Sequence, residues 1–211
     1  MKQLRFFTLL LLLLPMVAWS NSSAVRLGQL LQDVRAIEAD FMQFSFRNLD
    51  QGMDLISEAE GRMWLQYPDQ VYWQAEEPVM QVVLADGKHL YVWDQDLEQV
   101  TREPLGDRLK ASPASILISG PDAIRRDFKV SEQELTEGIE SYELIPWLDN
   151  ELYTRLVLSF VAGKPKEVQI FDTLGNATML IFNDLNINPE IAADRFSLQV
   201  PEYTDWIIVG D

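Results

Sequence analysis

Apolar and polar residues alternate in short runs along most of the chain, and turn residues such as Asp86-Gly87 separate the runs. Short runs of this kind, bounded by turn residues, predict β-strands. The expected strands lie at 41–49, 56–66, 71–76, 79–84, 90–94, 99–102, 128–131, 141–145, 154–161, 167–172, 178–185, 196–200 and 206–209. Some of the shortest runs are expected not to form strands. With no repeat or linker, the pattern predicts one mainly β domain, an unclosed antiparallel β-barrel of about eleven strands.

Two segments show helical signals instead. Residues 24–39 place apolar side chains at the spacing of one helical face, and Ser22 and Ser23 are candidate caps. A short helix is expected at 114–119, between Ser112-Pro113 as its start and Gly120-Pro121 as its stop. This short helix carries consecutive apolar residues, which are Ile116, Leu117 and Ile118. We expect these helices to cover the sheet, with the short one as a lid.

Several of the expected strands are apolar on both faces, above all between residues 61 and 101. Strict alternation would expose one face of the sheet to water. The second face therefore needs a cover, and we expect it to be partly the protein's own helices and partly a lipid. The residues predicted to line a lipid-binding cavity are Phe44, Phe46, Leu65, Leu90, Val92, Met179 and Ile181. An ordinary core sealed by the first helix is the alternative for each of them.

The first twenty residues predict a cleavable secretory signal, which leaves residues 21–211 as the folded domain. Lys2 and Arg5 precede an apolar core at 6–14, and Ala18-Trp19-Ser20 supplies small residues for cleavage. The chain has no cysteine. Disulfides are therefore excluded, and the signal lacks the cysteine of a lipid-anchored bacterial protein. We expect a mature protein that is soluble after export.

Charge and residue content narrow the chemistry further. The formal net charge of −16 disfavours nucleic acid and anionic membrane surfaces as partners. A single histidine, His89, argues against a catalytic triad and against a zinc site. Asp94, Asp96 and Glu98 alternate, so they could hold calcium or act as a glycosidase-like pair, but a solvated turn is the favoured interpretation. We expect no enzyme activity, no metal and no cofactor.

An ordered set of short segments is similar to the outer-membrane lipoprotein carrier family, LolA. The most specific block runs from Ala85 to Thr101, ADGKHLYVWDQDLEQVT. The other matching pieces are ADFMQ at 39–43, GRMWL at 61–65, YP at 67–68, VYW at 71–73, Pro78, Gln81, SP at 112–113, Ile116-Leu117, YELIP at 142–146, Asp172, LG at 174–175, Phe196, Pro201 and Asp205. Together they span nearly the whole chain after the signal.

The resemblance implies an unclosed β-barrel with a helical lid and a hydrophobic interior for lipoprotein acyl chains. It also implies a monomeric periplasmic carrier in a Gram-negative cell, loaded by the inner-membrane LolCDE transporter and unloaded to the outer-membrane acceptor LolB. A periplasmic sensor that binds lipid or lipoprotein with the same fold is the alternative. Many family members carry an arginine after the glutamine of the first strand, where it helps to hold the lid closed. Here that position is Phe44.

Overall fold

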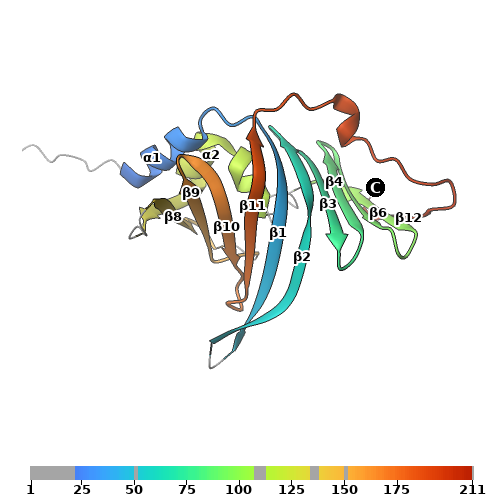
Figure 1. Ribbon diagram of the computed structural model, residues 1–211, viewed down its shortest axis with the longest axis horizontal. Helices are drawn as coiled ribbons and strands as arrows, with labels where there is room; N and C mark the ends of the chain where they lie inside the picture. Colours follow the sequence, from blue (N-terminus) through green and yellow to red (C-terminus); the bar gives the residue numbers. More distant parts are fainter. Residues whose placement is uncertain (1–21, 50–51, 107–112, 134–137, 150–151, 211) are drawn as a thin grey trace, which may run out of the picture.

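The computed structural model describes residues 22–49, 52–106, 113–133, 138–149 and 152–210, so the predicted signal lies outside the described residues. Its strands, in chain order, are β1 (Ala36–Leu49), β2 (Gly52–Gln66), β3 (Gln70–Glu77), β4 (Gln81–Asp86), β5 (His89–Asp94), β6 (Gln99–Pro104), β7 (Phe128–Glu132), β8 (Ile139–Pro146), β9 (Arg155–Val161), β10 (Lys164–Phe171), β11 (Ala177–Ile187) and β12 (Asp205–Ile208). They form one sheet of twelve strands in the order β12-β6-β5-β4-β3-β2-β1-β11-β10-β9-β8-β7. The sheet is open and strongly curved (Figure 1). The predicted mainly β, single-domain fold is confirmed.

One strand pair departs from the predicted antiparallel pattern. β12 pairs with β6 in parallel, with Asp205 opposite Gln99. After β11 the chain crosses from the middle of the sheet to its far edge and arrives there in the direction of β6 (Figure 1). The long connection makes a parallel pair possible, whereas a short hairpin would not.

The helices are α1 (Ser22–Leu31), η2 (Pro113–Ile118), α2 (Gly120–Asp127) and η3 (Ala193–Phe196). The helix predicted at 24–39 is too long, because Ile37 lies in β1 opposite Ile187 and Leu65. The short helix ends before Gly120-Pro121 as predicted, and a second helix, α2, begins at Gly120, whose positive φ of 78° turns the chain between η2 and α2. The strand predicted at 196–200 is also wrong, since Phe196 ends η3. None of the described helices has the length and apolarity needed to cross a membrane.

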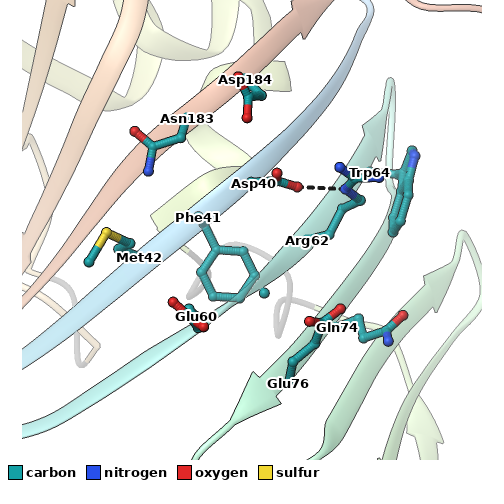
Figure 2. A pocket seen from close by; sticks show the side chains of 11 residues that line it. Asp40, Phe41, Met42, Glu60, Arg62, Trp64, Gln74, Glu76, Asn183 and Asp184 are labelled. Atoms are coloured by element: carbon teal, nitrogen blue, oxygen red, sulfur yellow. Dashed lines mark hydrogen bonds and ion pairs between the residues drawn. The ribbon is translucent and has the colours of Figure 1, made fainter.

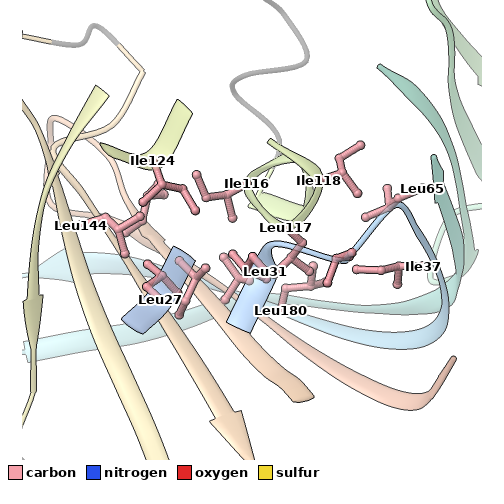
Figure 3. Packing of buried hydrophobic residues seen from close by; sticks show 14 of the residues in the cluster. Leu27, Leu31, Ile37, Leu65, Ile116, Leu117, Ile118, Ile124, Leu144 and Leu180 are labelled. Atoms are coloured by element: carbon pink, nitrogen blue, oxygen red, sulfur yellow. The ribbon is translucent and has the colours of Figure 1, made fainter. Parts of the chain in front are cut away.

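One face of the sheet, which we call the inner face, is covered by α1, η2 and α2. Along β1, Ile37, Ala39 and Phe41 point to this face and are buried, because alternate residues of a strand share a side. Leu27 and Leu31 of α1 pack into the same hydrophobic cluster, which also includes Leu65, Leu144, Leu180 and the η2 side chains (Figure 3). This cluster is the main core.

The opposite, outer face carries a second apolar group where β2 to β6 are covered by the C-terminal segment. Trp64, Leu84 and Val100 are buried there, and Phe196 of η3 is buried above them. The guanidinium of Arg195 lies 4.1 Å from the Trp64 ring centre, a cation–π contact. Both faces of this half of the sheet are therefore apolar, and on the outer face the cover is the protein's own chain.

Candidate functional site

The short helix predicted as a lid lies directly on the inner face of the sheet. Ile116, Leu117 and Ile118 are 6%, 1% and 1% exposed. η2 contacts β2, β10 and β11, and Figure 3 shows Ile118 beside Leu65, and Leu117 directed toward Leu31 and Leu180. The labelled contacts join aliphatic side chains, so η2 is held on the sheet through burial of apolar surface.

Two longer helices, α1 and α2, pack together next to η2. α2 follows η2 directly in the chain, and it packs on α1 at Gly28. A Cβ added at Gly28 would lie 3.2 Å from Pro121 Cβ and 3.4 Å from Arg125 Nη1. The absent side chain therefore allows the two helices to approach closely. Ile124 of α2 is fully buried in the core cluster, so η2 and α2 belong to one packed unit.

Next to the lid, the inner face continues as a row of half-buried apolar side chains. Trp73 of β3 lies opposite Met63 and Val83, and Val83 lies opposite Val92. Met63 is buried under the helices, whereas Trp73, Val83 and Val92 are each partly exposed. Trp73 stacks on Phe41 with ring centres 3.8 Å apart. This row of paired side chains runs from η2 across β3, β4 and β5, so apolar surface extends along the inner face beyond the helices.

The structure divides the seven predicted cavity residues between the two faces. Leu65 is buried beneath the lid, and Leu90 and Val92 lie on the same inner face, since Leu90 pairs with Ala85 and Val92 with Val83. The other four lie together on the outer face: Phe44 pairs with Met179, Met42 with Ile181, and Phe46 with Ala177. The seven therefore do not share one cavity.

Strand parity explains this correction. Phe41 is buried on the inner face, so Phe44 and Phe46 must point outward from the same strand. The large aromatic side chains at these positions suggested an inward direction, but the side of a strand that faces the core depends on pairing with other strands. The outward direction of Phe44 keeps its side chain away from η2, which lies on the inner face.

Two inner-face residues, Trp73 and Val83, were missed by the sequence prediction. Trp73 lies next to Tyr72 in a run with apolar side chains on both faces, and this ambiguity hides the inward one. Their pairing with Met63 and Val92 would have identified them, because directly paired residues share a face. The pairing register of β2, β3, β4 and β5, which the sequence alone does not give, is needed to place Trp73 and Val83 on the inner face.

The polar side chains near the core have structural roles, because they hydrogen-bond to neighbouring side chains and turn backbones. Burial raises the pKa of Tyr142 to about 12, and the phenol donates a hydrogen bond to Glu140 Oε2 at 3.2 Å. The pKa of Asp86 lies below its usual value. Burial alone would raise this pKa, but the hydrogen bonds donated by the backbone amides of His89 and Lys88 outweigh the effect of burial. Asp94 Oδ1 accepts a hydrogen bond from the Leu97 backbone at 3.0 Å, which closes the turn after β5. Asp86 and Asp94 thus organise turns.

Comparisons with known proteins agree with the geometry of a sheet with an apolar lid. Residues 32–199 match the family model described as outer membrane lipoprotein carrier protein LolA. The chain is similar to the outer-membrane lipoprotein carrier protein of Chromohalobacter salexigens, with 36% identity over 94% of this chain and 93% of the relative. It is similar to that of Pseudomonas putida strain W619, with 34% identity over 86% and 84%. An uncharacterized conserved protein from Thermus thermophilus shares the fold, with a TM-score of 0.53, 11% identity, and coverage of 89% of this chain and 97% of that one.

Proposed function

We propose that this chain, which belongs to the LolA family of outer membrane lipoprotein carrier proteins, carries lipoproteins across the periplasm by covering their acyl chains with its inner face. The observation that supports this most directly is the lid. Three aliphatic side chains of one short helix are buried against an apolar sheet, and a half-buried apolar row continues beside them. Acyl chains replace the lid on this surface when cargo is bound.

The energies of lid and cargo are comparable, which a reversible carrier requires. Burying an aliphatic side chain is worth about 1.5–3 kcal/mol, so the three lid residues together contribute roughly 5–9 kcal/mol. A buried methylene is worth about 0.8 kcal/mol. An acyl chain that buries about ten methylenes therefore gains about as much as the lid loses, and the exchange needs no tight pocket.

The route follows from the family and from the predicted signal. Residues 1–20 direct export and are removed, so that the carrier works in the periplasm. Cargo is received from the inner-membrane transporter LolCDE and passed to the outer-membrane acceptor LolB. The lid opens for each exchange and closes in between, because water-exposed aliphatic side chains on η2 are unfavourable.

The test places a charge on the lid. Ile116→Glu and Leu117→Glu each put a carboxylate where the closed lid is buried, which disfavours closure. We expect both variants to release more lipoprotein from spheroplasts than the unaltered protein does, because a lid that closes poorly competes less with the acyl chains for the inner face. The matched control is Leu174→Glu, because Leu174 is 77% exposed in the turn before β11.

Circular dichroism and thermal unfolding establish that each variant is folded before release is scored. Unchanged release with a folded Leu117→Glu would contradict the lid assignment. A fluorescent triacylated lipopeptide provides a second test with purified protein. If the unaltered protein does not bind this lipopeptide, the proposed carrier function is wrong.

A further inference from the structure

The outer face contains a groove of about 560 Å³ between β1, β2, β3 and the end of β11 (Figure 2). It lies on the side of the sheet opposite the lid. Its lining includes the charged residues Asp40, Glu60, Arg62, Glu76 and Asp184. Four carboxylates thus face one guanidinium among the described lining residues.

Two β-bulges shape this groove. Between β2 and β3 the register shifts at Gly61, so that Glu76 is the extra residue of β3. Between β1 and β11 it shifts after Glu38, and Asp184 of β11 lies in the shifted segment with a positive φ of 46°. Bulges redirect side chains out of the regular pleat. Here each bulge brings a carboxylate to one side of the groove.

The single guanidinium is already occupied. Arg62 Nε donates to Asp40 Oδ1 at 2.5 Å, as Figure 2 shows, and its guanidinium lies 5.8 Å from the Trp64 ring centre. In the described part of the chain, the carboxylates of Glu60, Glu76 and Asp184 form no ion pair. All three carboxylates are exposed to solvent, so a ligand can reach them, although the hydrogen-bonded Asp40 and, to a smaller degree, Glu76 both raise the pKa of the Arg62 guanidinium.

The carboxylates are spread along the groove rather than gathered at one point. The described residues include no group of three acidic or histidine side chains that could hold a metal ion. A single small cation is therefore a poor match. Several positive charges on an extended segment fit the spacing better.

An apolar strip continues from the groove along the outer face of β1 and β11. Met42 lines the groove, is 38% exposed and pairs with Ile181. Beyond this pair lie Phe44 and Met179, which are opposite each other and half-buried. The outer face therefore presents a row of carboxylates beside a row of partly exposed apolar side chains.

We propose that the outer-face groove and its apolar strip dock a protein segment that carries lysine or arginine side chains next to apolar ones. Charge complementarity favours this occupant, because three exposed carboxylates attract positive charges and the 38%-exposed Met42 offers an apolar contact beside them. A second copy of this chain is disfavoured by its formal charge of −16. The docking face is separate from the lid, so a partner can hold the carrier while cargo is exchanged on the other side.

The experiment titrates the isotopically labelled, purified protein with a short alternating lysine–leucine peptide, followed by NMR. The groove variant combines Glu60→Gln, Glu76→Gln and Asp184→Asn, and asparagine tolerates the positive φ at 184. The control variant removes three exposed charges elsewhere, with Asp96→Asn, Glu190→Gln and Glu202→Gln. We expect shifts on β1, β2 and β11, binding that is at least about tenfold weaker in the groove variant, and less than about a twofold change in the control.

Three results would overturn the proposal. Equal weakening by both variants would mean that overall charge alone attracts the peptide. A lysine–serine peptide that binds as tightly as lysine–leucine would remove the role of the apolar strip. Shifts confined to η2 and the inner face would place the peptide in the cargo site. Lipopeptide binding is expected to stay unchanged in the groove variant, so a failure of docking is distinguishable from a failure of the carrier function.

Discussion

Shortening one lid side chain tests the balance between lid and cargo quantitatively. Leu117 is 1% exposed and lies in the same hydrophobic cluster as Leu31 and Leu180, toward which it is directed (Figure 3). Leu117→Ala removes apolar contacts that exist only when the lid is closed. A buried leucine truncated to alanine costs about 2–5 kcal/mol in a core that cannot relax. Because η2 is a short segment that can shift, we take about 2 kcal/mol for the loss of closed-lid stability.

This loss should increase the affinity for an acyl ligand. A ligand that binds only the open form has an apparent affinity reduced by the fraction of open protein. If the closed form dominates, a shift of about 2 kcal/mol raises the open fraction, and hence the affinity, by about 30-fold. A ligand site that did not compete with the lid would show no such gain.

A dansyl-labelled fatty acid provides the assay, since its fluorescence rises in an apolar environment. The control is Leu174→Ala, which makes the same chemical change at a side chain that is 77% exposed and distant from the lid in sequence. We expect tighter binding for Leu117→Ala and unchanged binding for the control. An affinity that stays the same or falls in a folded Leu117→Ala protein would refute the argument that lid and ligand compete for one surface.

Three further changes probe the framework around the two faces. Gly28→Val should separate α1 from α2, because a Cβ there already approaches Pro121 at 3.2 Å; a lower midpoint of thermal unfolding would show this. Gly61→Ala should cost about 3 kcal/mol or more in urea unfolding, since its Cβ would lie 1.9 Å from the Gln74 carbonyl oxygen. Asp86→Ala should cost about 1–2 kcal/mol by removing hydrogen bonds to two backbone amides. Because the pKa of Asp86 is held below its usual value, this difference should be complete at neutral pH and shrink as the pH falls below about 4, whereas Asp86→Asn should retain part of the stability at all pH values.

Local patterns were sufficient to predict most strands and the short helix η2. The apolar run of β5 and the Asp86-Gly87 turn before it depend on neighbouring residues, so they are visible in the sequence. The first helix was predicted too long because Val34 and Ile37 continue the helical spacing by chance. Ile37 instead alternates with Glu38 in a strand, and its pairing with Ile187 stabilises that choice. A contact so distant in sequence leaves no local signal.

The candidate site shows the same limit. Ile116, Leu117 and Ile118 could be selected as a lid because three consecutive apolar residues in a short helix need a cover. The face on which Phe44 lies could not be predicted, because a strand with apolar residues on both faces fits the core with either face inward. The outer groove was also hidden, because it depends on two register shifts that only the paired strands reveal.

The parallel pairing of β12 with β6 has a consequence for how the molecule avoids association with itself. Without β12, the backbone amides and carbonyls along one side of β6 would be open to any passing strand. β12 spans only Asp205–Ile208, and so short a border offers little template for growth. This last strand therefore replaces the longer edge of β6 with a short one. Its removal would expose an unpaired strand edge that favours aggregation.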